Sequence, residues 1–153
     1  MSFRILPLNM AEFAPLFRLS DEELAARRAR RMAKGTGMPC RVSLADAEEG
    51  ETVLLLNYTH LDVDTPYRAS HAICVRENAR EADLAVDEVP VAIRRRLVSA
   101  RLFDEEGNIV GSDVFEGTEL AGFLTQGFQR ADVGFAHIHY ARNGCFAAKA
   151  VRA

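Results

Sequence analysis

The sequence has little cysteine and no long apolar run. Its three cysteines, Cys40, Cys74 and Cys145, are too few for a secreted disulfide framework, and their number is odd. Apolar runs such as residues 53–56 are far too short to span a bilayer, and residues 1–7 lack the apolar core of a signal peptide. We therefore expect a cytoplasmic protein with reduced thiols that does not insert into a membrane.

The sequence also lacks an excess of charge of one sign. Nineteen Lys and Arg residues against 22 Asp and Glu residues give a net charge of −3, so neither nucleic acid nor a membrane surface is an expected partner. Hydrophobic residues at 48% are typical of a soluble globular protein. No repeat, linker or composition break divides the chain. We expect a single domain over residues 1–153 and leave its oligomeric state open.

The pattern of elements predicts an α+β fold: a largely antiparallel sheet, an N-terminal helix and a helix inserted before a C-terminal hairpin. A capping box of Ser20 and Glu23 begins a helix over residues 21–32. Apolar residues at helical spacing predict the inserted helix after Thr118. Strands are expected at residues 41–44, 51–60, 71–75, 97–103 and 109–115, followed by the C-terminal hairpin.

Two of the four histidines, His137 and His139, lie in this C-terminal hairpin. The pair Asn143-Gly144 favours a two-residue type I′ turn, because both central residues of that turn need a positive φ. Alternate side chains of a strand share a face. The two imidazoles should therefore project together from the sheet.

The register of the hairpin follows from the length of its turn. Counting outward from a two-residue turn places His139 opposite Ala148 and His137 opposite Ala150. We therefore expect the imidazoles to face a space lined by two small alanines, which a helix, a ligand or a third strand has to fill.

Three interpretations of His137 and His139 are open. They are structural imidazoles at the edge of the core, or metal ligands, or metal-free acid–base or ligand-binding groups. A zinc site needs a third protein ligand, for which His60, Asp62 and Cys40 are the candidates. The sequence identifies neither a metal nor a cofactor.

Other polar residues also have two interpretations each. Asn57 lies in an apolar strand, so its amide either orders a loop or contacts a ligand. Arg68, beside Tyr67 in a loop, either binds a carboxylate or phosphate or is a surface charge. The arginines of residues 27–31 form a solvated face or bind an anionic partner. Cys40 is an activated thiol or a small buried hydrophobe.

Five segments carry a resemblance to a known family: residues 3–7 (FRILP), 39–44 (PCRVSL), 54–60 (LLLNYTH), 66–70 (PYRAS) and 137–148. In this order, and over nearly the whole chain, they resemble the bacterial family called domain of unknown function 1203. The resemblance implies no established activity, substrate or cofactor. Residues that match the family pattern are Cys40, Arg41, Asn57, His60, Tyr67, Arg68, His137, His139 and Cys145. His71 and Cys74 stand where relatives often carry Gly and Phe, which directs attention away from them.

We interpret the chain as a domain with a small-molecule site, in which His137 and His139 are the catalytic groups. The residues expected to bind a small acidic ligand are Asn57, His60, Tyr67 and Arg68. Whether the protein is an enzyme is left open; an enzyme of this kind would use histidine to transfer a proton in a hydrolysis or isomerisation. The alternative is a non-catalytic interaction domain with structural histidines, whose partner docks on the arginine-rich helix or on a sheet edge. A pocket reached by both His137 and Arg68 would favour the first interpretation.

Overall fold

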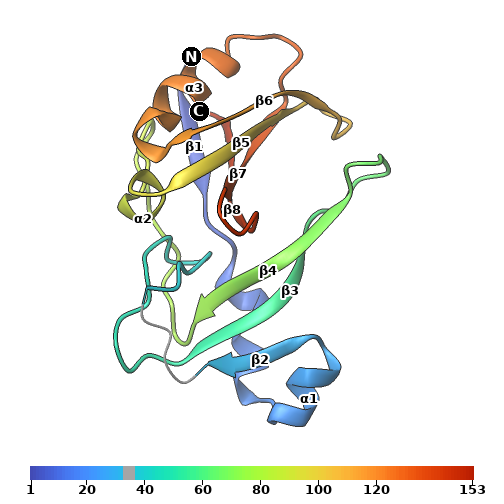
Figure 1. The fold of residues 1–153 in the computed structure, drawn as a ribbon, viewed down its shortest axis with the longest axis vertical. Helices are drawn as coiled ribbons and strands as arrows, with labels where there is room; N and C mark the ends of the chain where they lie inside the picture. Colours follow the sequence, from blue (N-terminus) through green and yellow to red (C-terminus); the bar gives the residue numbers. More distant parts are fainter. Residues whose placement is uncertain (33–36) are drawn as a thin grey trace.

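The structure is a computed structural model that describes residues 1–32 and 37–153. Within these residues the strands form two antiparallel sheets, which lie one above the other in Figure 1. The larger sheet, in the order β1-β8-β7-β5-β6, contains β1 (Phe3–Leu6), β5 (Leu97–Phe103), β6 (Ile109–Glu116), β7 (Phe135–Tyr140) and β8 (Phe146–Arg152). The smaller sheet, in the order β2-β3-β4, contains β2 (Ala29–Met32), β3 (Val53–Leu61) and β4 (Ala69–Arg76).

Short helices connect these strands. The α-helices are α1 (Asp21–Ala26), α2 (Val91–Arg94) and α3 (Leu120–Gly127), and the 3₁₀ helices are η1 (Met10–Glu12), η2 (Ala14–Arg18) and η3 (Gly117–Glu119). The predicted α+β class is confirmed, including the N-terminal helix and the helix before the C-terminal hairpin. The strands, however, are divided between two sheets, and the space between those sheets becomes important for the site.

Two predicted elements are wrong. The helix predicted over residues 21–32 ends at Ala26, and Ala29–Met32 instead pairs with Val53–Leu56 of β3. The backbone groups of β3 on that side need partners, and this pairing overrides helix propensity. The strand predicted over residues 41–44 is a turn, because Leu44 has a φ of 50°, which a strand does not allow.

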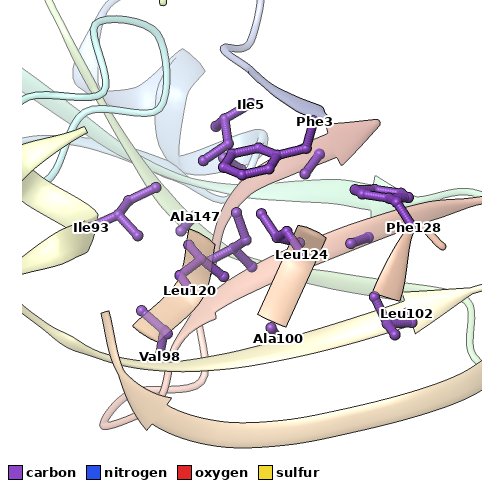
Figure 2. Packing of buried hydrophobic residues seen from close by; sticks show 14 of the residues in the cluster. Phe3, Ile5, Ile93, Val98, Ala100, Leu102, Leu120, Leu124, Phe128 and Ala147 are labelled. Atoms are coloured by element: carbon purple, nitrogen blue, oxygen red, sulfur yellow. The ribbon is translucent and has the colours of Figure 1, made fainter. Parts of the chain in front are cut away.

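The main hydrophobic core fills the space between the larger sheet and the helices α2 and α3. Figure 2 shows Val98 and Ala100 of β5 beneath Leu120 and Leu124 of α3, all four side chains being buried. Leu120 and Leu124 are one helical turn apart and therefore share the helix face that packs on the sheet. This core occupies one face of the larger sheet.

A second core lies against the smaller sheet and the N-terminal helices. Its buried residues include Phe13, Leu24, Leu54, Leu56, Ile73, Val75 and Phe146. Phe146 belongs to β8 of the larger sheet and is only 2% exposed. Its ring therefore ties the two sheets together at the point where they approach each other.

The turn of the C-terminal hairpin differs from the prediction. Of the pair Asn143-Gly144 only Gly144 has a positive φ, 75°, whereas a type I′ turn needs two such residues. The Tyr140 N–H donates to the Cys145 carbonyl over 2.9 Å, and the Gly144 N–H donates to the Tyr140 carbonyl over 2.8 Å. The loop is therefore residues 141–144, with glycine at its left-handed position.

The predicted register is wrong for the same reason. His139 pairs with Phe146 rather than Ala148, and His137 pairs with Lys149 rather than Ala150. The longer loop moves the partner of His139 by two residues, and a β-bulge between the pairs of Ile138 and His139 reverses one of them, so the partner of His137 differs by one. An aromatic ring, and not an alanine, therefore lies directly across from His139.

Candidate functional site

All four histidines of the chain converge between the two sheets. Ile138 faces the main core, so its neighbours His137 and His139 project from the opposite face of the larger sheet. His60 and His71 project toward them from β3 and β4 of the smaller sheet. The imidazole centroids of His60 and His139 are 5.0 Å apart, and those of His71 and His139 are 5.2 Å apart. We call these four residues the histidine centre.

Two β-bulges position side chains at the histidine centre. In the β3–β4 hairpin Thr59 pairs with Ser70 and Leu61 pairs with Ala69, so His60 is the extra residue of a β-bulge. A second bulge, in β8, sets Phe146 across from His139. The Phe146 ring stacks on the His60 ring, with a distance of 4.8 Å between the ring centroids and an interplanar angle of 9°. A bulge redirects a side chain out of the regular alternation, and bulges are common beside functional sites.

Only one of the two ring nitrogens of His139 has a hydrogen-bond partner among the described residues. Its Nδ1 lies 2.9 Å from the Gly144 carbonyl, which can only accept, so Nδ1 carries the proton. Nε2 is then an unprotonated acceptor, and it is buried without a hydrogen-bond partner among the described residues. Buried polar atoms normally have a partner, so this lone pair requires an explanation. A histidine that ligates a metal through one nitrogen and donates from the other to a carbonyl has this arrangement.

His60 connects the centre through both of its ring nitrogens. Its Nδ1 lies 3.2 Å from Nδ1 of His137, and its Nε2 lies 2.7 Å from Nδ1 of His71. If His60 Nδ1 donates to His137, then His60 Nε2 is a lone pair directed at His71. In that tautomer His137 orients His60 in the same way that the Gly144 carbonyl orients His139.

The centre is electrically neutral at physiological pH. Burial is the main cause that lowers the pKa of His60 to about 3, of His137 to about 2 and of His139 to about 4. Burial also lowers the pKa of His71. Repulsion from neighbouring imidazoles and from Arg101 adds to burial in lowering the pKa of His60 and His137. Neutral imidazole is the form that binds metal ions.

Arg101 is the cation that acts on every histidine of this centre. It pairs with His137 across β5 and β7, so the two side chains share a face of the larger sheet. Its positive charge lowers the pKa of all four histidines. Among the described residues its guanidinium forms no ion pair. Arg101 therefore adds uncompensated positive charge beside the neutral imidazoles, and so does Lys149, which pairs with His137 and lowers its pKa.

Three of the histidines can hold a metal ion. One ring nitrogen each of His60, His71 and His139 lies within 4.8 Å of the other two. Zinc binds histidine nitrogens at about 2.0–2.1 Å with tetrahedral geometry, and catalytic sites keep the fourth position open. An ion between these rings requires His60 and His71 to separate slightly, because their nitrogens are only 2.7 Å apart.

The other residues predicted for the site lie elsewhere. Asn57 is exposed on the opposite face of β3, next to Arg28 and Ala72. Tyr67 is 42% exposed, and Arg68 forms a 2.9 Å ion pair with Asp62 on the surface. The structure thus brings together His60, His137 and His139 and leaves Asn57, Tyr67 and Arg68 outside the centre.

Of the three candidates for a third metal ligand, only His60 lies beside the histidine pair. Asp62 instead forms an ion pair with Arg68 on the surface. Cys40 is buried, and its Sγ accepts hydrogen bonds from the backbone N–H groups of Ser43 and Arg76 at 3.5 and 3.4 Å. Cys40 is therefore a packing residue in this structure.

Sequence reasoning missed His71 and Arg101. The sequence did contain a signal for His71, because the strands predicted at residues 51–60 and 71–75 are close enough to form a hairpin. In the structure their pairing places His71 across from Tyr58, on the same face as His60. The resemblance to relatives that carry Gly at this position pointed away from it. Arg101 could be found only from the pairing of β5 with β7, two strands that are separated in the sequence by residues 104–134.

The fold and the centre define an α+β protein of two antiparallel sheets with a histidine cluster between them. The family model described as "Protein of unknown function (DUF1203)" matches residues 37–152, and the chain belongs to this family. No curated protein and no solved structure matches the chain. Among the described residues, none of the helices is both long enough and apolar enough to cross a membrane.

Proposed function

We propose that this protein binds a divalent transition-metal ion through His60, His71 and His139, and that the bound ion takes a small anionic molecule as its further ligand. The observation that carries the proposal is the buried, unpartnered Nε2 of His139, which faces two other imidazoles. Three neutral histidines suit Zn²⁺ and related first-row ions. His137 orients His60 and is not counted among the ligands.

The anionic ligand follows from the charge of the site. A divalent ion held by three neutral imidazoles keeps its full positive charge, and Arg101 adds another. Buried positive charge is stabilised by an anion that reaches it. A carboxylate or phosphate could coordinate the ion in its open position while Arg101 binds a second oxygen. Arg101 thus takes the role that the sequence suggested for Arg68.

Calorimetric titration of the metal-free protein with Zn²⁺ tests this proposal. We expect one ion to bind per chain, and His139→Ala and His71→Ala each to abolish binding. The half-buried His71 serves as the second variant because its removal disturbs the core less than that of His139, which is 0% exposed. His137→Leu removes only the group that orients His60, and should weaken binding about 10- to 100-fold.

A thiol variant provides the control. Cys145 is partly exposed and could bind zinc adventitiously, so Cys145→Ser should leave the titration unchanged. The proposal fails if the wild-type protein binds no zinc, or if folded His71→Ala protein binds it as tightly as the wild type. In that case the histidines are structural, and the interaction-domain alternative takes its place.

A further inference from the structure

A pocket of about 780 Å³ lies where the C-terminal hairpin meets the other face of the smaller sheet. Leu55 and Ala72 line it from β3 and β4, whereas the histidines project from the opposite face of these strands. Its other wall includes Tyr140, Arg142 and Cys145 of the hairpin. The pocket is therefore a separate site, and its size suits a small organic molecule.

Positive charge dominates the lining of this pocket. Among the residues that the structure describes, the lining contains four arginines and a single carboxylate: Arg41, Arg95, Arg96, Arg142 and Glu116. Arg95 and Arg96 both pair with Asp46, which lies outside the lining. Arg41 and Arg142 form no ion pair among the described residues.

Arg41 is the most unusual of these residues because it is only 3% exposed. Its Nε donates to the Phe146 carbonyl over 2.6 Å, and its Nη1 donates to the Pro39 carbonyl. Carbonyl oxygens satisfy hydrogen bonds but do not cancel a charge, so a buried cation remains at the pocket wall. An anion in the pocket would compensate this charge.

Tyr140 adds an oriented polar group. The guanidinium of Arg41 lies 5.1 Å from the centre of its ring and that of Arg96 lies 5.4 Å away, so two cations fix the ring. Burial raises the pKa of Tyr140 to about 12, and its hydroxyl stays protonated at neutral pH. That hydroxyl has no hydrogen-bond partner in the described parts of the chain, and it is available as a donor.

We infer that this pocket binds a small molecule with an anionic group and a flat apolar body. Arg41, Arg142 and the Tyr140 hydroxyl supply the positive charge and donors for a phosphate or carboxylate. Leu55, Ala72 and Leu97 supply the apolar wall for the body. The inference does not depend on metal binding at the histidine centre.

Calorimetric titration with phenyl phosphate and with benzoate tests the inference and identifies the preferred anionic group. We expect at least one of the two to bind, and neutral benzyl alcohol not to bind. Arg142→Ala should weaken binding about tenfold, which corresponds to about 1.4 kcal/mol. Tyr140→Phe, which keeps the ring and removes the hydroxyl, should weaken it as well. Ala72→Phe fills the pocket and should abolish binding.

Two controls separate this site from others. Arg94 is exposed on α2 and does not line the pocket, so Arg94→Ala changes the net charge equally and should leave binding unchanged. His71→Ala, which removes a proposed metal ligand, should also leave it unchanged. Failure of both anions to bind would overturn the inference. So would undiminished binding by Ala72→Phe, or weakening by Arg94→Ala equal to that by Arg142→Ala.

Discussion

At the scale of single residues, the histidine centre combines close packing with low proton affinity. Burial lowers the pKa of His60, His137 and His139 far below the value of about 6.5 that histidine has in an unfolded chain. Below pH 6.5 the unfolded chain therefore takes up protons that the folded protein does not bind. The stability associated with these residues is complete above pH 6.5 and is lost as the pH falls toward their folded values.

This difference predicts acid sensitivity well above the range in which carboxylates titrate. His60, His137 and His139 should each lower the unfolding free energy of the metal-free protein by about 1.4 kcal/mol per pH unit between pH 6.5 and pH 5. Urea denaturation at pH 7 and at pH 5 measures this decrease in the unfolding free energy. In His137→Leu the loss should be smaller by about 2 kcal/mol, because one proton fewer is taken up on unfolding. Equal stability at the two pH values in the wild type would show that the folded centre accepts protons.

At the same scale, sequence reasoning succeeded where a rule of alternation sufficed. His137 and His139 share a face because they are two residues apart on a strand, as predicted. It failed for Asn57, which was expected in a buried strand and is exposed. Burial of a given strand face depends on which sheet packs against it, and a single sequence does not specify that packing.

At the scale of elements, turns and bulges decide where the site residues point. The Asn-Gly signal correctly located the hairpin but not its turn type or its register. A bulge adds one residue to one strand only, and no residue type marks it in the sequence. Most of the predicted strands are confirmed because their periodicity is local. The pairing of β2 with β3 is not local, and there the prediction of a longer helix was wrong.

Gly144 provides a test of the hairpin turn. It has a φ of 75°, and a Cβ added to it would meet no atom within 4 Å, so only backbone strain opposes alanine. Gly144→Ala should lower the unfolding free energy by about 1–2 kcal/mol. Exposed Gly122 in α3 also has open space around it but has no positive φ, so Gly122→Ala should raise stability by about 0.5–1 kcal/mol. Urea denaturation measures the unfolding free energy of both variants. Equal changes in the two variants would contradict the positive φ of Gly144 in the turn.

At the scale of the whole molecule, the site exists because two sheets face each other. β3 and β4 supply His60 and His71, while β7 supplies His137 and His139. Phe146 of β8 belongs to the core of the smaller sheet and stacks on His60. The fold class was predictable from the order of elements, but the division into two sheets was not, because it depends on contacts between distant segments.

The central claim is that both sheets contribute imidazoles to one metal ion. X-ray absorption at the zinc K-edge of the zinc-loaded protein tests it most directly, since it reports the type and number of ligands around the ion. We predict a first shell of nitrogen and oxygen at about 2.0–2.1 Å, with the outer-shell scattering of three imidazoles. A sulfur shell at about 2.3 Å, or a shell without imidazole scattering, would contradict the account.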